Sequence, residues 1–310
     1  MLRRAAVLAL LLVWIVVGGC GSSVARVRDE VAATGVAEVD RPVIRLGTKN
    51  FTEQFVVGEL YAQALRAEGF RVEVKDDLGS SELVDEVLTG GGIDMYPEYT
   101  GVIVGEIAAQ RRRPASAAET YRRAKEFQAR RGFEVLAMSP GSDRLANAVT
   151  PATARRHRLR TMADLERLGR YRYGGFPENR VRFQGALGVR REYGLDFTFV
   201  PLRTADRRYA ALDSGEVDVV DVGTTEPQLA DRSRYRVLED PKGIFGFQNI
   251  VPVVSRATVR AQGPELVPTL DAVTAKLTDA ALQDMNRAVD VDGESPADVA
   301  RRFLRANDLL

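Results

Sequence analysis

The fold is decided in residues 43–75, VIRLGTKNFTEQFVVGELYAQALRAEGFRVEVK, which predict a strand, a helix and a second strand. Val43–Gly47 and Arg71–Lys75 alternate apolar and polar side chains, as strands with one buried face do. One face of the helix between them carries Phe55, Val56, Leu60, Tyr61, Ala64 and Leu65. Gly69 ends this helix, so the chain returns directly to a strand beside the first.

The following residues add another helix and strand to this unit. Asn50 and Thr52 can cap the first helix, and Ser80 can cap the second. The glycines of Gly90–Gly92 end the second helix, and Ile93–Tyr96 has the composition of a third strand. The order βαβαβ predicts an open parallel sheet.

A second βαβαβ unit is predicted further along the chain. Its elements are strand Tyr173–Phe176, helix Val181–Tyr193, strand Phe197–Pro201, helix Arg207–Leu212 and strand Val217–Val222. Gly194 and Gly215 stop its helices, as Gly69 and Gly91 stop those of the first unit. Any two such units share glycine stops, so the match predicts architecture and carries no statement about ancestry.

Two α/β lobes in one chain predict a ligand cleft, because ligands bind where the carboxyl ends of such strands face each other. Three further helices, expected to pack on the first lobe, are predicted at Pro264–Leu277, Thr278–Ala288 and Pro296–Asn307. We therefore place lobe I at residues 42–145 plus 252–310 and lobe II at residues 146–251. The chain crosses between the lobes twice.

Residues 1–20 have the parts of a signal peptide. Arg3–Arg4 is positively charged, Ala5–Val17 is apolar but too short to span a bilayer comfortably, and two glycines precede Cys20. This arrangement resembles the lipobox of bacterial lipoproteins, in which the cysteine carries the lipid; the alternative is an ordinary secretory signal with an incidental cysteine. Residues 21–41 are poor in large apolar side chains and suit a flexible tether.

Composition excludes several classes of function. Lys and Arg number 44 against 43 Asp and Glu, so no global field favours nucleic acid. His157 is the only histidine and Cys20 the only cysteine, so a disulfide, a histidine-rich metal site and His-dependent nucleophilic catalysis are not expected. Asp94 and Glu98 could form an acid and base pair, but a turn aspartate and a solvated glutamate explain them as well. An enzyme is the weaker alternative.

Ordered motifs then point to a known family. They are GTKNFTEQ at Gly47–Gln54, LGSS at Leu78–Ser81, IDMYPEYTG at Ile93–Gly101, YAAL at Tyr209–Leu212 and FGFQN at Phe245–Asn249. Together they resemble the signatures of the glycine betaine, choline and osmoprotectant substrate-binding proteins of ABC transporters. The resemblance covers nearly all of residues 42–310.

This resemblance implies a type II periplasmic-binding fold that closes around its ligand. It implies an exported, monomeric binding subunit on the outer face of the cytoplasmic membrane, anchored by lipid at Cys20. Its partners would be an ABC permease with its ATPase, and it would need no cofactor and catalyse no reaction. Alternatives on the same fold are a binder of a different small zwitterion and a sensory ligand-binding module.

The family's ligands, among them glycine betaine, choline and carnitine, imply an anion subsite and an aromatic cage for the cation. Lys49 matches the lysine of the first motif, and Arg182 the arginine of the second lobe, with Arg180 as the alternative. The complete set of ligand-binding residues that the resemblance implies is Lys49, Asn50, Tyr99, Thr100, Asp143, Arg182, Thr224 and Phe247.

The implied cage is incomplete. Leu145 and Gly223 stand where other members carry cage aromatics, and Val102 replaces a threonine after the Tyr-Thr-Gly motif. Fewer aromatic faces hold a trimethylammonium group less tightly, which places glycine betaine itself in doubt. Residues that could complete the cage, or equally belong to the core, are Phe51, Phe176, Tyr209 and Phe245.

Overall fold

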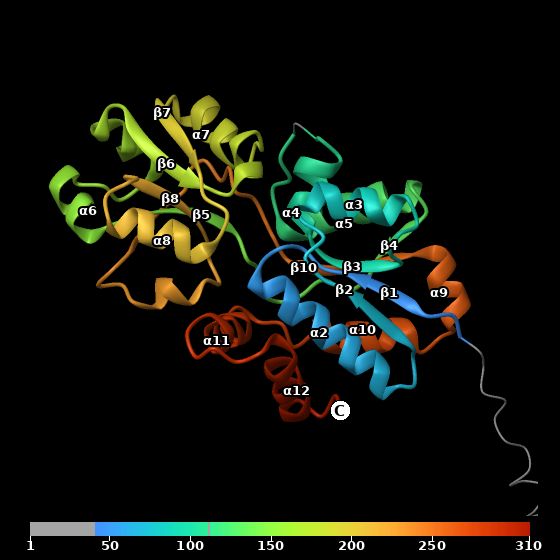
Figure 1. Ribbon diagram of the computed structural model, residues 1–310. Coiled ribbons are helices and arrows are strands. Elements are labelled where there is room, and N and C mark those ends of the chain that lie inside the picture. Colours follow the sequence, from blue (N-terminus) through green and yellow to red (C-terminus); the bar gives the residue numbers. More distant parts are fainter. Residues whose placement is uncertain (1–40, 111) are drawn as a thin grey trace, which may run out of the picture. The chain divides into compact units, whose positions relative to one another are not determined.

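The first of two sheets is built from both ends of the described chain. A computed structural model describes residues 41–110 and 112–310. In the sheet order β2-β1-β3-β10-β4, the strands are β1 (Ile44–Gly47), β2 (Val72–Lys75), β3 (Met95–Tyr99), β10 (Ile250–Ser255) and β4 (Phe133–Val135). β1 runs parallel to β2 and β3, whereas β10 is antiparallel to β3 and β4 (Figure 1). The sheet is therefore mixed and not wholly parallel.

The second sheet repeats this plan. In the order β7-β6-β8-β5-β9, its strands are β5 (Leu145–Val149), β6 (Tyr171–Gly175), β7 (Phe197–Pro201), β8 (Val219–Gly223) and β9 (Arg236–Leu238). β6 is parallel to β7 and β8, and β5 is antiparallel to β8 and β9. The prediction of two α/β lobes is confirmed, and in each one the parallel strands are extended by an antiparallel pair that pattern alone did not reveal.

Helices of lobe I connect its strands. They are α2 (Thr52–Ala67), α3 (Ser81–Thr89), α4 (Thr100–Val102), the π-helical turn η1 (Ile103–Ile107) and α5 (Ala117–Arg130). The predicted caps of α2 are wrong, because its N-cap residue is Phe51 and no side chain caps it. Thr52 instead donates a hydrogen bond from Oγ1 to Asp290 Oδ1 at 2.6 Å. The start of α2 is thus tied to the C-terminal helices.

The helices of lobe II differ from those predicted, one being shorter and another longer. They are α6 (Pro151–His157), η2 (Met162–Leu168), η3 (Pro177–Arg180), α7 (Ala186–Tyr193), α8 (Ala205–Asp213) and η4 (Pro227–Ala230). The expected helix Val181–Tyr193 begins only at Ala186, after a 3₁₀ turn that Pro177 opens. A Cβ at Gly185 would lie 2.3 Å from the Asn179 carbonyl oxygen, so the chain packs closely on that turn before α7 begins. This close approach brings side chains of η3 to the sheet edge.

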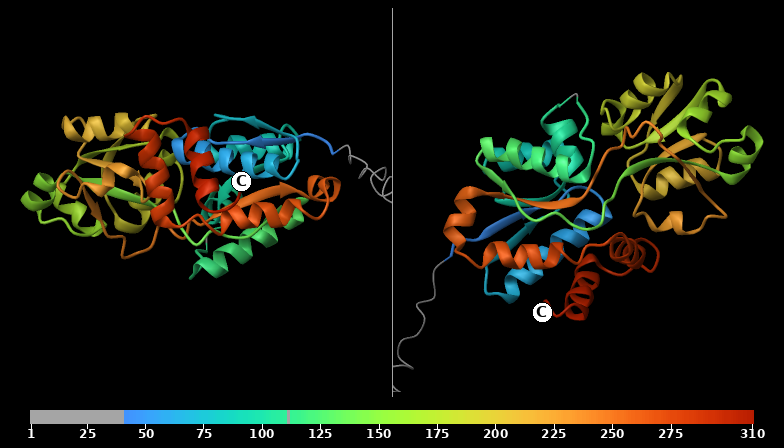
Figure 2. Two further views of the ribbon diagram at one scale, coloured as in Figure 1. Left: turned by 90° about the horizontal axis from the view of Figure 1, so that it is seen from below. Right: turned by 180° about the vertical axis from the view of Figure 1, so that it is seen from behind.

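The C-terminal helices return to lobe I. They are α9 (Arg256–Gln262), α10 (Leu266–Thr274), α11 (Asp279–Asp290) and α12 (Pro296–Ala306). Gly263, at a φ of +87°, separates α9 from α10, so the predicted single helix from Pro264 is shorter and has an unpredicted neighbour. α10, α11 and α12 pack against α2 and thus on lobe I, as the sequence led us to expect; Figure 2 shows the orange and red C-terminal helices beside the blue one. None of the described helices is long and apolar enough to span a membrane.

Both faces of the lobe I sheet are covered by apolar side chains. Met95 packs with α2 and the C-terminal helices on one face, and Tyr96 packs with α3 and η1 on the other. Successive residues of a strand point to opposite faces, so burial of both makes β3 a fully covered central strand. The loops that follow its carboxyl end are held by this packing.

Candidate functional site

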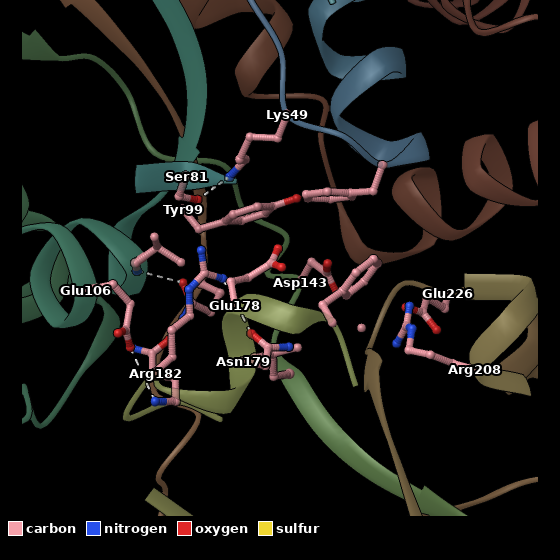
Figure 3. Close-up of a pocket in the computed structure, with 17 residues that line it drawn as sticks. Lys49, Ser81, Tyr99, Glu106, Asp143, Glu178, Asn179, Arg182, Arg208 and Glu226 are labelled. Atoms are coloured by element: carbon pink, nitrogen blue, oxygen red, sulfur yellow. Dashed lines mark hydrogen bonds and ion pairs between the residues drawn. The ribbon is translucent and has the colours of Figure 1, made fainter. Parts of the chain in front are cut away.

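A cavity of about 100 Å³ lies at the carboxyl ends of strands from both sheets (Figure 3). Lys49 follows β1, Tyr99 ends β3, Phe176 follows β6 and Gly223 ends β8, and all four line the cavity. This is where open α/β sheets bind ligands, because the connecting loops diverge there. Both lobes therefore contribute walls to one small cavity.

Lys49 is buried with a carboxylate of its own lobe. Its side chain is 2% exposed and forms an ion pair with Glu98, which is 0% exposed. The Lys49 ammonium also donates to Ser81 Oγ at 3.3 Å and lies 4.1 Å from the ring centroid of Tyr99. Burial lowers the pKa of Lys49, while the charge of Glu98 opposes that shift. The predicted anion-binding lysine thus already holds an internal anion.

Asp94 and Glu98 have separate cationic partners. Asp94 binds Arg45, with Oδ1 2.8 Å from the guanidinium, and Glu98 binds Lys49. Glu98 Oε1 also accepts the backbone N–H of Tyr99 at 2.7 Å. Structural ion pairs therefore account for both carboxylates.

Aromatic side chains form one wall of the cavity. The rings of Phe51 and Tyr99 are nearly parallel, at 15°, with centroids 6.3 Å apart. The Tyr99 hydroxyl donates to Glu53 Oε1 at 2.7 Å, which fixes its ring. In Figure 3 the Lys49 side chain lies on one side of Tyr99, and Asp143 lies on the other. The side of the Tyr99 ring that faces away from Lys49 therefore borders the cavity.

Arg182 crosses the cavity edge to bind the other lobe. Its Nε donates to Glu82 Oε1 at 2.8 Å and its NH2 donates to Glu82 Oε2 at 2.6 Å. Partial burial opposes ionisation of Glu82, but the hydrogen bonds and charge of Arg182 lower the pKa of its carboxyl to about 2. Arg180, the sequence alternative, is exposed and does not line the cavity. The two lobes are thus joined by a forked ion pair.

Glu82→Gln is expected to lower the melting temperature at neutral pH and to have little effect near pH 2. Folding lowers the Glu82 pKa from 4.5 to about 2, so its stabilisation is complete above pH 4.5 and is lost as the pH falls toward 2. Circular dichroism melts of both full chains across this range measure the difference. A gap between variant and wild type that stays constant down to pH 2 would contradict the assignment.

Further polar bonds join the lobes around the cavity. Thr225 Oγ1 of lobe II donates to Glu53 Oε2 of lobe I at 2.6 Å. Gln184 Nε2 donates to the Gly101 carbonyl at 3.1 Å. Burial raises the pKa of Glu53, which the hydrogen bonds from Thr225, Tyr99 and Asn286 partly offset. Separating the lobes would break the Thr225–Glu53 and Gln184–Gly101 bonds.

Arg208 is a second buried cation, and sequence analysis missed it. Its guanidinium is 1% exposed, donates to Glu226 Oε1 at 2.6 Å and to Asp221 Oδ1 at 3.1 Å, and lies 4.3 Å from the Phe176 ring centroid. Burial raises the pKa of Asp221 to about 6 despite the charge of Arg208. Tyr209 donates to the other oxygen of Glu226 at 2.6 Å. This network closes one end of the cavity.

Three carboxylates that line the cavity, Asp143, Glu106 and Glu178, have no described cation bonded to them. Asp143 accepts the Thr225 backbone N–H at 3.2 Å, and Glu106 accepts that of Gln184 at 3.3 Å. Burial raises the pKa of both, and for Asp143 the nearby charge of Glu53 adds to the shift. A positive ligand would relieve this cost by pairing with them.

Asp143 also explains the glycine at position 223. A Cβ added to Gly223 would lie 2.8 Å from Asp143 Oδ1 and 3.0 Å from Oδ2. The carboxylate therefore fills the space that a larger side chain at Gly223 would need. At this point the cavity wall is acidic and not aromatic.

The eight predicted ligand-binding residues divide into two groups. Those that line the cavity are Lys49, Tyr99, Asp143 and Arg182. Asn50 borders a neighbouring hollow, and Phe247 is partly buried outside the cavity lining. Thr100 donates to the Phe247 carbonyl at 3.1 Å and Thr224 to the Ser142 carbonyl at 3.2 Å, so both hydroxyls hold loops.

Of the aromatic residues that could complete the cage, two line the cavity and two do not. Phe51 and Phe176 line the cavity. Tyr209 instead packs on Tyr235, with ring centroids 4.7 Å apart, and Phe245 is in the lobe II core. Cavity residues that sequence analysis missed include Glu106, Asn179, Gln184 and Arg208. No local motif marked them, since their partners are distant in sequence.

Comparisons with known proteins identify the family of the chain. A family model for the substrate binding domain of ABC-type glycine betaine transport systems matches residues 42–306. The chain is similar to a glycine-betaine-binding protein of Pseudomonas aeruginosa, with 31% identity over 293 residues that cover 90% of this chain and 91% of the relative. It is also 26% identical to the glycine betaine-binding protein YehZ of Escherichia coli, over 84% of this chain and 90% of that one.

Solved structures share the fold. A glycine betaine/carnitine/choline ABC transporter structure superposes with a TM-score of 0.68 and 23% identity, covering 86% of this chain and 99% of that one. A choline-binding protein in complex with choline superposes with a TM-score of 0.65 and 16% identity, covering 86% and 89%. At these identities the likeness shows a common two-lobed α/β fold.

Proposed function

The chain belongs to the family of substrate-binding domains of ABC-type glycine betaine transport systems, and we propose that its cavity captures a small solute with a quaternary ammonium group. One observation carries this proposal: the Phe51 and Tyr99 rings and the Asp143 carboxylate border the same small cavity. A methylated ammonium has no N–H to donate, so it is best held by ring faces and by an uncoordinated negative charge. Glycine betaine, choline and carnitine are the candidate ligands.

Ligand capture would proceed by closure of the lobes. The forked Arg182–Glu82 pair and the Thr225–Glu53 bond join the lobes on either side of the cavity. A ligand that contacts both walls favours this closed arrangement by its higher affinity for it. The two crossings of the chain, before β5 and before β10, are the places where a hinge would bend. The lobe boundaries predicted from the sequence, after residues 145 and 251, lie just inside β5 and β10, a short way beyond these crossings.

We further propose where the protein works and with which partners. The family consists of extracytoplasmic binding proteins of ABC importers. The lipoprotein signal predicted at residues 1–20, with lipid on Cys20, lies outside the described residues and supports anchoring to the outer face of the cytoplasmic membrane. Residues 21–41 would then tether a monomeric binding protein that delivers its ligand to a permease with its ATPase.

Calorimetric titration of the purified full chain tests the ligand class. We expect choline, glycine betaine, carnitine, ergothioneine or proline betaine to bind, with a negative heat-capacity change as the cavity closes. Dimethylbutanol, the uncharged analogue of choline, should bind at least about tenfold more weakly because it lacks the cation. If none of the charged compounds binds, or if the uncharged analogue binds equally well, the quaternary-ammonium proposal is wrong.

A further inference from the structure

Each cation that lines the cavity is already paired with a carboxylate of the protein. The pairs are Lys49–Glu98, Arg182–Glu82 and Arg208–Glu226. A carboxylate-bearing ligand therefore finds no free cation among the described residues of the cavity wall. It can gain an ion pair only by displacing one of these internal anions.

The Arg182–Glu82 pair is the one that a ligand can displace. Its carboxylate is 40% exposed, whereas Glu98 is 0% exposed and Glu226 is 16% exposed. Its members come from different lobes, so the pair also opens when the lobes separate. Ser81, the residue before Glu82, lines the cavity. Glu82 thus lies at the border between the cavity and solvent.

Glu82 offers Arg182 the same chemistry as a ligand carboxylate. Two parallel N–H···O bonds of 2.8 and 2.6 Å engage both carboxylate oxygens, which is the geometry that an incoming carboxylate would need. Being part of the chain, Glu82 competes at a high effective concentration and loses no translational freedom on binding. A free carboxylate ligand therefore starts at a disadvantage for this guanidinium.

The charged groups of the cavity wall that have no ion-pair partner among the described residues are carboxylates. Asp143 and Glu106 face the cavity and accept backbone N–H groups from Thr225 and Gln184, and Glu178 lines it as well; none of the three forms an ion pair with a described cation. The unmet charge of the cavity is therefore negative. A ligand with a cation and no anion matches that charge more closely than a zwitterion does.

We infer that Glu82 is a specificity-determining residue, which occupies Arg182 and so selects a cationic ligand without a carboxylate at that end. This inference rests on the proposed function and narrows it from quaternary ammonium compounds in general to cations of the choline type. Removing the Glu82 charge would free Arg182 for a ligand carboxylate and shift the preference toward glycine betaine.

The test is calorimetric titration of choline and glycine betaine against three full chains: wild type, Glu82→Gln and Glu86→Gln. Glu86 is exposed on the same helix, so its variant removes the same charge without freeing Arg182. We expect wild type to prefer choline and Glu82→Gln to raise the affinity for glycine betaine relative to choline by about tenfold or more. The Glu86 variant should keep the wild-type ratio.

The ratio of the two affinities separates specificity from simple loss of closure. If Glu82→Gln weakens both ligands equally, the ion pair acts only as a latch between the lobes and the inference is overturned. A wild-type chain that prefers glycine betaine also overturns it, while leaving the quaternary-ammonium function intact. If neither compound binds any of the three chains, the proposed function fails, and this inference fails with it.

Discussion

Lys49→Met is expected to lower the free energy of unfolding by about 3–5 kcal/mol, the usual cost of breaking a buried ion pair from one side. The substitution keeps the length of the side chain but leaves Glu98 buried, at 0% exposure, without its cation. Glu98 Oε2 already has no hydrogen-bond partner among the described residues, so it cannot recover the lost interaction there. Urea denaturation of the full chain followed by circular dichroism measures the change.

The partner substitution supplies the control. Lys49→Met combined with Glu98→Gln removes both charges and should regain most of the lost stability, because no unpaired charge then remains buried. Lys125→Met removes a lysine that is exposed on α5 and should change stability by less than about 0.5 kcal/mol. A Lys49 variant as stable as the Lys125 variant would mean that Glu98 does not depend on Lys49.

Tyr99→Leu is expected to weaken choline and glycine betaine alike, by roughly thirtyfold. Leucine keeps an apolar side chain at the end of β3 but has no ring face, and a desolvated cation–π contact contributes about 2 kcal/mol. Both ligands carry the same trimethylammonium group, so both should lose affinity. Titration calorimetry with the full chain gives the two dissociation constants.

Tyr99→Phe separates the ring from its hydroxyl. This variant loses the 2.7 Å bond to Glu53 but keeps the aromatic face, so ligand affinity should stay within about threefold of wild type. If the phenylalanine variant loses as much affinity as the leucine variant, Tyr99 acts through Glu53 and not through its ring. If neither variant loses affinity, the cation binds elsewhere.

Sequence periodicity was sufficient to predict the parallel part of each sheet. Strands such as Ile44–Gly47 and Phe197–Pro201, and the glycines at positions 69, 194 and 215, are local signals that hold in any environment. It was not sufficient for β10, an apolar run whose antiparallel place beside β3 depends on where the chain returns after lobe II. It also mistook the start of α7, because Gly185 packs against the Asn179 carbonyl.

Site prediction had the same limit. Lys49 and Tyr99 were predicted from motifs at the carboxyl ends of strands, and both line the cavity. Glu82 and Arg208 carried no local signal of their role. Glu82 binds a residue 100 positions away, and Arg208 is buried against carboxylates that only the folded lobe brings together.

The sequence by itself determined the two α/β lobes, the strand ends that face one cavity and the family to which the chain belongs. Periodicity, glycine stops and motif order are signals carried by residues that are close together in the sequence. Only the tertiary structure decided which charged groups of that cavity pair with one another. Lys49 and Arg182, which the family resemblance predicts to clamp a ligand carboxylate, are both held by carboxylates of the protein. Such pairing depends on three-dimensional distance and shared burial, which the order of residues along the chain does not specify.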